Sequence, residues 1–333
     1  MLLKWGIACV GNISHDFVTA LSTLPREEHS VVAVAARNIE KAKEFADRHS
    51  IGAVYEGYEA LAKDTNVDVV YIGTINSEHF KLSKLFLDNG KHVLCEKPLC
   101  VNVRDTKNLL EYARSKNLLL MEGIWSRFFP AYTYIERQIK SGNLGDLKLL
   151  EAEFGYPLNY KYGPEAKITG GGTLVDLGIY PVQLALFLFN NEVPEKVEAT
   201  AAFNEHGIDV IIDKILHFKN GAVAHLKSSG MQLLGNKATI HGTKGKIEIT
   251  DFWCAVSLID IDGSAKEWPL PSATQKFNYP NSCGLKYEAE AVRQALMQGL
   301  IEVPKMTHED SIRLAELQER FKLIIGIKYE TDN

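Results

Sequence analysis

The residues Val93-Leu94-Cys95-Glu96-Lys97-Pro98 are the strongest indication of the fold class of this chain. This stretch begins with apolar residues, as in a buried strand, and ends abruptly in an acid, a base and a proline. Because proline cannot extend a central strand and keeps the preceding residue out of helical geometry, Lys97 is expected at the carboxyl end of a strand. In an open α/β sheet ligands bind at that edge. A solvated lysine at the start of a loop is the alternative.

Outward from this stretch, the first 123 residues alternate between short apolar runs and helical patterns. Strands are expected at 4–10, 31–36, 53–55, 67–72, 91–94 and 118–121, and helices at 39–49, 57–63, 79–89 and 102–116, with a further helix ending near residue 24. Continuous apolar strands that alternate with helices are typical of parallel sheets buried on both faces. This half of the chain therefore predicts a doubly wound, Rossmann-type sheet.

The first strand leads into a glycine turn, Gly11-Asn12-Ile13-Ser14. Strand, tight turn and helix open a dinucleotide-binding fold, in which the turn and the start of the helix hold the phosphates. Measured against the pattern G-x-G-x-x-G the motif is incomplete, because Val10 and Ser14 stand where glycines are expected. The turn therefore predicts a nucleotide site only together with the elements that follow it.

The strand at 31–36 ends in Arg37, where a dinucleotide-binding fold places the residue that contacts the adenosine ribose. An acidic residue there binds the 2′-hydroxyl of NAD, whereas an arginine suits the 2′-phosphate of NADP. We therefore predict a preference for NADP. A surface arginine at the start of the helix at 39–49 is the alternative.

Polar and aromatic residues follow two further strands. Thr74, Asn76 and His79 come after the strand at 67–72, although His79 also fits the plain role of a first-turn helix residue. Trp125 and Arg127 come after the strand at 118–121. We expect the cofactor site to be lined by Gly11, Asn12, Ile13, Arg37, Thr74, Asn76, His79, Glu96, Lys97, Trp125 and Arg127.

From residue 124 onward the regular alternation stops. Strands are expected at 147–155, 194–204, 208–219, 221–229, 237–241, 245–250 and 253–260, and helices at 131–141, 171–189, 284–299 and 308–326. Turn signals such as Asn220-Gly221 and Asp262-Gly263 separate neighbouring strands, so an antiparallel sheet is predicted.

A chain of 333 residues predicts two domains. We expect an NADP-binding Rossmann domain at 1–123 and a substrate-binding and dimerisation domain at 124–333. The second domain would hold a large, mostly antiparallel open sheet covered on one face by helices. Because the other face needs a partner, we predict a homodimer through it.

The second domain carries its own chemical motif, Gly170-Gly171-Gly172-Thr173-Leu174-Val175-Asp176-Leu177-Gly178-Ile179-Tyr180. Asp176 and Tyr180 are four positions apart, so a continuous helix would place them on one face. The glycines permit close approach of the backbone to a ligand. The alternative is an aspartate stabilised by a helix dipole and a packed, hydrogen-bonded tyrosine.

Composition excludes several classes of protein. Hydrophobic residues make up 46% and charged residues 24% of the chain, as in ordinary globular proteins. The net charge of −5 gives no electrostatic case for binding nucleic acid or an anionic membrane. Five scattered cysteines predict free thiols in a reducing cytoplasm, and ten dispersed histidines predict no metal site. The first residues lack the pattern of a signal peptide, which also favours the cytoplasm.

Together these motifs resemble the glucose–fructose oxidoreductase/inositol dehydrogenase family over almost the whole chain. The resemblance is closest to a branch that oxidises trans-dihydrodiols of aromatic hydrocarbons, or D-xylose, with NADP. The residues that carry it are Trp5-Gly6-Ile7, Val10-Gly11, Leu24-Pro25-Arg26, 31–37, Tyr71-Ile72-Gly73-Thr74, 94–98, 125–130 and the motif at 170–180.

The resemblance implies a catalytic set of Lys97, Asp176 and Tyr180. Tyr180 would act as the general base, because a neighbouring ammonium favours the phenolate form of a tyrosine. Lys97 would supply that ammonium and bind the substrate oxygen, and Asp176 would orient the substrate or the lysine. The reverse allocation, with Lys97 as the proton acceptor, stays open.

The substrate pocket implied by the resemblance contains Trp125, Phe154, Asp176, Tyr180 and Tyr279. Tyr180 follows the branch, because the wider family has a histidine there. Tyr279 departs from the phenylalanine of the branch, and Ala201-Ala202 stands where relatives carry arginine, so the substrate range is open. The rivals are an NADP-dependent reductase or dehydrogenase of another sugar or cyclitol, and a cofactor-sensing regulatory protein without catalysis.

Overall fold

The computed structural model describes residues 1–329, and they form two compact units. The first unit contains residues 1–100, 104–128 and 270–308, and the second contains the remainder. The expected division between residues 123 and 124 makes each domain one continuous segment. The units are discontinuous, because residues 270–308 return to pack with the nucleotide-binding half of the chain.

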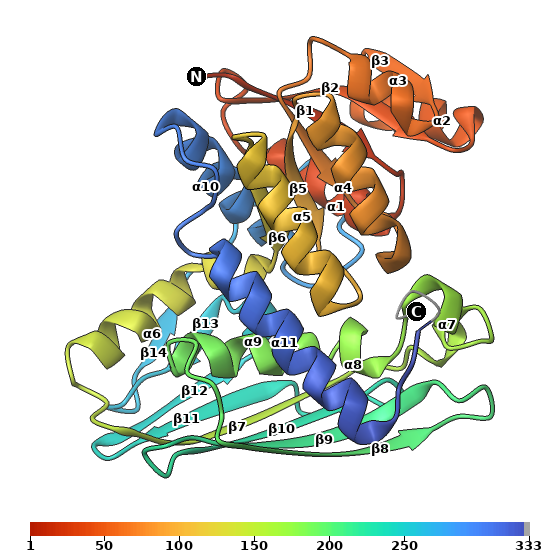
Figure 1. Cartoon of the computed structure of the whole chain (residues 1–333). Helices are drawn as coiled ribbons and strands as arrows, with labels where there is room; N and C mark the ends of the chain where they lie inside the picture. The colour runs from red at the N-terminus through yellow and green to blue at the C-terminus, as the bar shows by residue number, and fades with distance from the viewer. Residues whose placement is uncertain (330–333) are drawn as a thin grey trace. The chain divides into compact units, whose positions relative to one another are not determined.

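The first unit is built on a six-stranded sheet in the order β3-β2-β1-β4-β5-β6, and every pair of neighbours is parallel. Its strands are β1 Leu3–Ala8, β2 His29–Ala36, β3 Ala53–Glu56, β4 Val69–Ile72, β5 His92–Glu96 and β6 Leu120–Gly123. Its helices are α1 Asn12–Leu21, α2 Ile39–His49, α3 Tyr58–Lys63, α4 His79–Asp88, α5 Val103–Ser115 and α10 Leu285–Met297. The predicted doubly wound parallel sheet is confirmed (Figure 1).

Burial explains the continuous apolar strands of this sheet. All residues of β4 are buried, as are the last four of β2 and of β5, because helices pack on the sheet. The strand order reverses between β1 and β4, and a reversal of this kind opens a crevice at the carboxyl ends of the strands. A cofactor is therefore expected to bind at the turns after β1 and β4.

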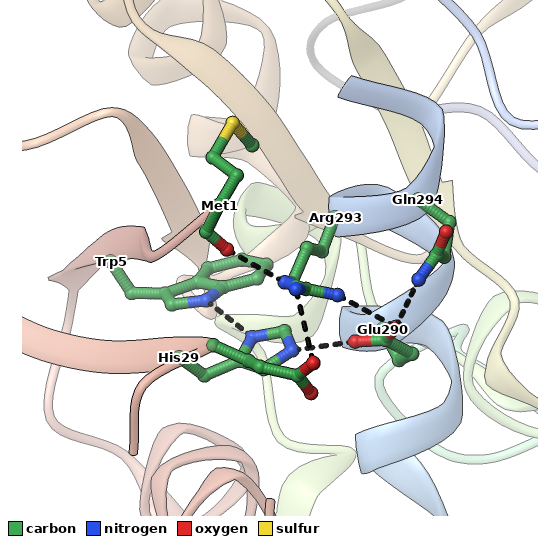
Figure 2. Close-up of polar contacts among 7 residues, drawn as sticks. Met1, Trp5, His29, Glu290, Arg293 and Gln294 are labelled. Atoms are coloured by element: carbon green, nitrogen blue, oxygen red, sulfur yellow. Dashed lines mark hydrogen bonds and ion pairs between the residues drawn. The ribbon is translucent and has the colours of Figure 1, made fainter. Parts of the chain in front are cut away.

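Helix α10 is fastened to the sheet by a buried polar cluster (Figure 2). The indole of Trp5 donates to Nδ1 of His29 at 3.2 Å, and Nε2 of His29 lies 2.8 Å from the carboxylate of Glu290. Arg293 bonds the carbonyl oxygen of Met1 at 2.8 Å and pairs with Glu28 at 3.1 Å. Burial lowers the pKa of His29, although its hydrogen bond to Glu290 opposes that shift. The cluster therefore joins strands β1 and β2 to a segment far away in sequence.

The second unit is built on an eight-stranded sheet in the order β14-β13-β12-β11-β7-β10-β9-β8. Its strands are β7 Leu147–Gly155, β8 Lys196–Phe203, β9 Asp209–His217, β10 Val223–Ser229, β11 Lys237–Gly242, β12 Gly245–Thr250, β13 Ser257–Ile259 and β14 Ala265–Glu267. Only β7 and β10 pair in parallel, so the predicted mostly antiparallel sheet is confirmed.

Helices cover one face of this second sheet (Figure 1). They are α6 Pro130–Lys140, α7 Ala166–Thr169, α8 Thr173–Asp176, α9 Ile179–Leu188 and α11 His308–Ile325. In β9 the buried side chains of Ile212, Lys214 and Leu216 alternate with more exposed ones. The opposite face carries Glu151, Glu153, Asp213, Lys227 and Lys237 around a depression of 670 Å³.

Two expected elements of the second unit are wrong in detail. The helix expected at 171–189 is broken into α8 and α9 at Leu177 and Gly178, so Asp176 and Tyr180 do not lie on one continuous helix. The amide of Gly178 bonds the carbonyl of Thr173 at 2.7 Å, five residues back, which interrupts the α-helical pattern. The strand expected at 253–260 is limited to β13, because Phe252–Cys254 forms a 3-10 turn.

The described part of the chain holds all five cysteines, and each is a free thiol as predicted. Within residues 1–329 no group of three or more histidine, cysteine, aspartate or glutamate side chains is arranged to hold a metal ion. No single described helix has both the length and the apolar composition to cross a bilayer, and the bent pair Ala166–Asp176 and Ile179–Leu188 reaches those criteria only when taken together.

Candidate active site

The turn after β1 has a backbone that glycine normally supplies. Cys9 has a φ of 89°, in the left-handed region that side chains rarely adopt, and its amide bonds the carbonyl of Ala35 at 2.9 Å. Cys9 therefore occupies the position of the first glycine of the dinucleotide motif. The sequence interpretation that put the missing glycine at Val10 is wrong by one residue.

Helix α1 begins in a way that suits a phosphate. Its first residue follows Gly11, which has an extended backbone and no side chain to cap the helix, and the first turn holds no acid. Amide groups at such a helix start attract anions. The neighbouring Gly73 is hemmed in by Ser14, whose hydroxyl oxygen would lie 2.6 Å from an added Cβ, so backbone and helix approach closely there.

Arg37 lies directly after β2 and is exposed. Its charge acts on the nearby Tyr58 phenol, and the pKa of Tyr58 is raised to about 12 by burial and by Cys9, against the opposing effect of Arg37. Arg37, Tyr58 and Cys9 are therefore neighbours. Arg37 therefore lies near the turn that the sequence assigns to the nucleotide. An arginine at this place suits a nucleotide with a 2′-phosphate.

Strand β5 extends two residues beyond the expected end at residue 94, so Lys97 directly follows the strand. Glu96 is its last residue, and its carboxylate accepts hydrogen bonds from the Tyr71 hydroxyl at 2.7 Å and from the Lys97 amide at 3.3 Å. Burial raises the pKa of Glu96, while the hydrogen bond from Tyr71 and the charge of Lys97 oppose that shift. The backbone of Lys97 is thereby anchored at the strand end.

His79 is completely buried beside this strand end. Its Nδ1 lies 2.7 Å from the carbonyl oxygen of Pro98, and its Nε2 lies 3.3 Å from that of Thr74. Burial lowers the pKa of His79, and the charge of Lys97 acts in the same direction. These contacts tie the loop after β4 to the loop after Lys97, and His79 is also the first residue of α4, the alternative position considered for it.

The remaining first-unit candidates come from two segments. Trp125 and Arg127 lie in a buried 3-10 turn, Trp125–Phe128, after β6. Tyr279 belongs to the returning segment, where the carboxylate of Asp16 accepts the Tyr279 amide at 3.0 Å and the Asn278 amide at 2.8 Å. The backbone of Tyr279 is thus held by α1 of the nucleotide-binding unit.

In the second unit the structure brings Tyr180 and Phe154 together. Their rings meet edge to face, with centroids 5.6 Å apart, and both side chains are buried. Phe154 also stacks on Trp253 with a centroid separation of 4.2 Å, and Tyr156 closes the cluster at 5.8 Å from Phe154. An apolar wall of this kind suits a flat or hydrophobic substrate surface.

Asp176 is the last residue of α8, and its charge acts on two buried side chains of the same unit. Its charge acts on the buried Tyr162, whose pKa is raised first by burial and then by Asp176. It also helps to raise the pKa of the buried Asp209, on which burial has the largest effect. Asp176 is more exposed than its neighbours in α8, which leaves it the accessible acid of this group.

Sequence reasoning missed several residues near the predicted ones. Cys9 carried no signal, because its unusual backbone is not visible in its side chain. Tyr58 and Trp253 read as ordinary core positions. The charge of Glu96 acts on the ionisation of Glu288 in α10, and the return of residues 270–308 to the first unit brings the two residues together.

Family comparisons agree with this geometry. A family described as an oxidoreductase family with an NAD-binding Rossmann fold matches residues 3–124, and the GFO/IDH/MocA C-terminal domain matches residues 132–248. The chain belongs to this family of oxidoreductases, so the resemblance stated from its motifs is confirmed.

Individual relatives are similar over their full length. The chain is 44% identical over 332 residues to trans-1,2-dihydrobenzene-1,2-diol dehydrogenase of Xenopus tropicalis, covering 99% of this chain and all of that one. It is 41% identical over 334 residues to the Danio rerio protein of the same name, covering all of both. It is 40% identical over 333 residues to the Homo sapiens protein, covering 100% and 99%.

Solved structures share the fold at lower identity. A 3-ketoreductase from Actinomadura kijaniata, in complex with NADP and TDP-benzene, has a TM-score of 0.81 at 24% identity, covering 98% of each chain. A levoglucosan dehydrogenase in complex with NADH and levoglucosan has a TM-score of 0.84 at 20% identity, also covering 98% of each chain.

Proposed function

We propose that this protein is an NADP-dependent dehydrogenase that oxidises a hydroxyl group of a trans-dihydrodiol of an aromatic hydrocarbon, of D-xylose, or of both. The observation that carries the proposal is full-length similarity to relatives named trans-1,2-dihydrobenzene-1,2-diol dehydrogenase. The aromatic contact between Tyr180 and Phe154 supports a ring-shaped or sugar substrate.

The first unit would hold the cofactor. Backbone amides at the start of α1 would bind the pyrophosphate, and Arg37 would bind the 2′-phosphate of NADP. The loop residues Thr74 and Asn76 and the turn at Trp125 and Arg127 would border the nicotinamide half. Bound NADP supplies the acceptor for the hydride that leaves the substrate carbon.

The residues proposed for proton transfer are Lys97, Tyr180 and Asp176. Tyr180 takes the proton of the substrate hydroxyl, and the Lys97 ammonium favours the phenolate and binds the substrate oxygen. Asp176 orients the substrate or the lysine. In the reverse allocation Lys97 accepts the proton and Tyr180 orients the hydroxyl.

The chemistry of the product favours oxidation of either substrate. Oxidation of a dihydrodiol gives a hydroxyketone that tautomerises to a catechol, so aromatisation draws the reaction forward. Oxidation of D-xylose at its anomeric carbon gives a lactone, and hydrolysis of the lactone has the same effect. A second candidate substrate class, another sugar or cyclitol, is favoured by Tyr279 and Ala201-Ala202, which depart from the pattern of the branch.

Kinetics of two variants test the proposal. Lys97→Met and Tyr180→Phe should each lower kcat by about 10²–10⁴-fold, the usual loss on removing an acid–base group. NADPH formation would be measured with trans-benzene dihydrodiol, D-xylose and a panel of cyclitols. NADP binding without turnover of any of these would favour a cofactor-sensing protein, and near-normal kcat in both variants would overturn the assignment.

We also propose a cytoplasmic homodimer. Free buried thiols suit a reducing compartment. The uncovered face of the second sheet carries acids and bases together, so two copies related by a two-fold axis can pair opposite charges.

A further inference from the structure

Strand β9 carries two charged side chains in the interior of the second unit. Asp209 has 2% and Lys214 has 1% of its surface exposed. Burial raises the pKa of Asp209 to about 7 and lowers that of Lys214 to about 7, while the opposite charge of each group acts against the shift of the other. Because a charged side chain in the interior costs free energy unless specific partners compensate it, these two charges need an explanation.

Asp209 holds the start of helix α8. Its Oδ2 accepts the amide of Leu174 at 2.6 Å. The carboxylate also occupies the space beside Gly172, where an added Cβ would lie 2.2 Å from Oδ1, and the φ of Gly172 is 144°. Glycine is therefore required at this position by both the carboxylate and the backbone.

Lys214 holds the break between α8 and α9. Its Nζ donates to the carbonyl oxygen of Gly178 at 3.1 Å, and it lies 5.7 Å from the centre of the Phe321 ring. A Cβ on Gly178 would lie 2.7 Å from this Nζ. Gly178 is two residues before Tyr180, so the ammonium fixes the backbone from which that tyrosine starts.

Helix α8 needs such outside contacts because it is only four residues long. A helix of this length leaves most of its amide and carbonyl groups without partners inside the helix. The amide of Leu174 is bonded by Asp209, and the carbonyl of Leu174 accepts from Gln318 of α11 at 3.1 Å. Interior side chains of the unit thus set the orientation of the segment that carries Asp176 and Tyr180.

We propose that Lys214 is a positioning residue that fixes Tyr180 for catalysis through the carbonyl of Gly178, with Asp209 holding the adjoining helix α8. The proposal rests on the role of Tyr180 proposed above. Lys214 acts through the backbone and has no contact with substrate in this mechanism.

The test is a double-mutant cycle between Lys214→Met and Tyr180→Phe. Methionine keeps the volume of the lysine stem and removes the ammonium. In the parent protein Lys214→Met should lower kcat on the order of 10–10²-fold, as small displacements of a catalytic group do, with the KM for NADP unchanged. In the Tyr180→Phe background the same change should lower kcat less than about threefold, because residues that act as a unit are not additive.

The outcomes separate the two proposals. Near-normal kcat of Tyr180→Phe alone overturns the proposed function. Two results overturn the positioning role and leave the proposed function standing. In the first, Tyr180→Phe lowers kcat and Lys214→Met does not. In the second, Lys214→Met lowers kcat by the same factor in the parent protein and in the Tyr180→Phe background. Lys219→Met, at an exposed turn between β9 and β10, is the matched control and should leave kcat and the melting temperature unchanged.

A second variant distinguishes misplacement from poor folding. Lys214→Met removes a positive charge that favours the ionised form of the buried Asp209, so the melting temperature should fall. Lys214→Met combined with Asp209→Asn removes both charges and keeps an acceptor for the Leu174 amide, so the melting temperature should recover. The loss of kcat should persist in this pair, and recovery of kcat together with the melting temperature would contradict the positioning role.

Discussion

Arg37 is the residue on which the choice between the two nicotinamide cofactors depends. Its guanidinium lies beyond the end of β2 and near the Cys9 turn, where a 2′-phosphate would approach. Arg37→Ala should raise the KM for NADP about 10–100-fold, since a hydrogen bond to a charged group contributes about 1.5–3 kcal/mol. The KM for NAD should not change. Steady-state kinetics with both cofactors measures this, and Arg26→Ala, an exposed arginine, is the control. Equal KM values before and after Arg37→Ala would contradict the role.

At the scale of single residues, spacing predicted some positions and not others. Lys97 could be placed at a strand end because Pro98 restricts the residue before it. Cys9 could not be identified as the turn residue, because a cysteine gives no sign of a positive φ. Tyr279 was grouped with the second domain by its position in sequence, whereas the carboxylate of Asp16 fastens it to α1.

At the scale of elements, helix α10 introduces a carboxyl group into the core of the first unit. Glu288 is fully buried, and neither of its oxygens has a hydrogen-bond partner among the described residues. Burial raises the pKa of Glu288 well above its ordinary value, and the charge of Glu96 adds to the shift. The folded protein therefore keeps a proton on Glu288 that the unfolded chain releases above about pH 4.5.

This proton makes stability fall as pH rises. Folding takes up a proton between the unfolded and the raised folded pKa, so the free energy of unfolding decreases by up to about 1.4 kcal/mol per pH unit in that window. Glu288→Gln removes the titration and should be more stable than the parent at pH 8 but similar near pH 4. Denaturant unfolding at several pH values measures the difference. Glu111→Gln, on the exposed side of α5, should change neither value, and a pH-independent difference for Glu288→Gln would contradict the prediction.

Element boundaries were mostly predictable from periodicity, and the failures have tertiary causes. The residues of α9 are mostly apolar, so their periodicity does not separate them from α8, and Gly178 and Pro181 are the local signals of the break. The break is stabilised by Lys214, which approaches from β9 and cannot be paired with Gly178 by local sequence. Lysine is rarely buried, so a lysine such as Lys214 in a strand is expected to face solvent.

At the scale of the whole molecule, the uncovered sheet face predicts the oligomeric state. Analytical ultracentrifugation at micromolar concentration should give twice the 37.2 kDa of one chain. Lys227→Glu should shift the equilibrium toward monomer, because it removes a base and adds a fourth acid to a face that already holds Glu151, Glu153 and Asp213. Lys43→Glu, on α2 of the first unit, is the control. A monomeric mass for the parent protein would contradict the proposed homodimer.

The two kinds of sheet were predictable because strands buried on both faces read differently from strands buried on one. The sequence did not show which segments belong to which unit, because contacts between distant segments leave no local pattern. The ion pair of Arg293 with Glu28 and the contact of Glu290 with His29 join residues more than 250 positions apart.

The return of residues 270–308 to the first unit has a consequence for synthesis of the chain. The ribosome releases the six strands of the parallel sheet long before it releases α10, so the nascent sheet must wait for its last helix. During that interval Trp5 and His29 lack Glu290, and α1 lacks the loop that Asp16 binds. A fragment that stops after β6 would therefore keep the phosphate turn and still be an incomplete domain, dependent on later translation for closure of its core.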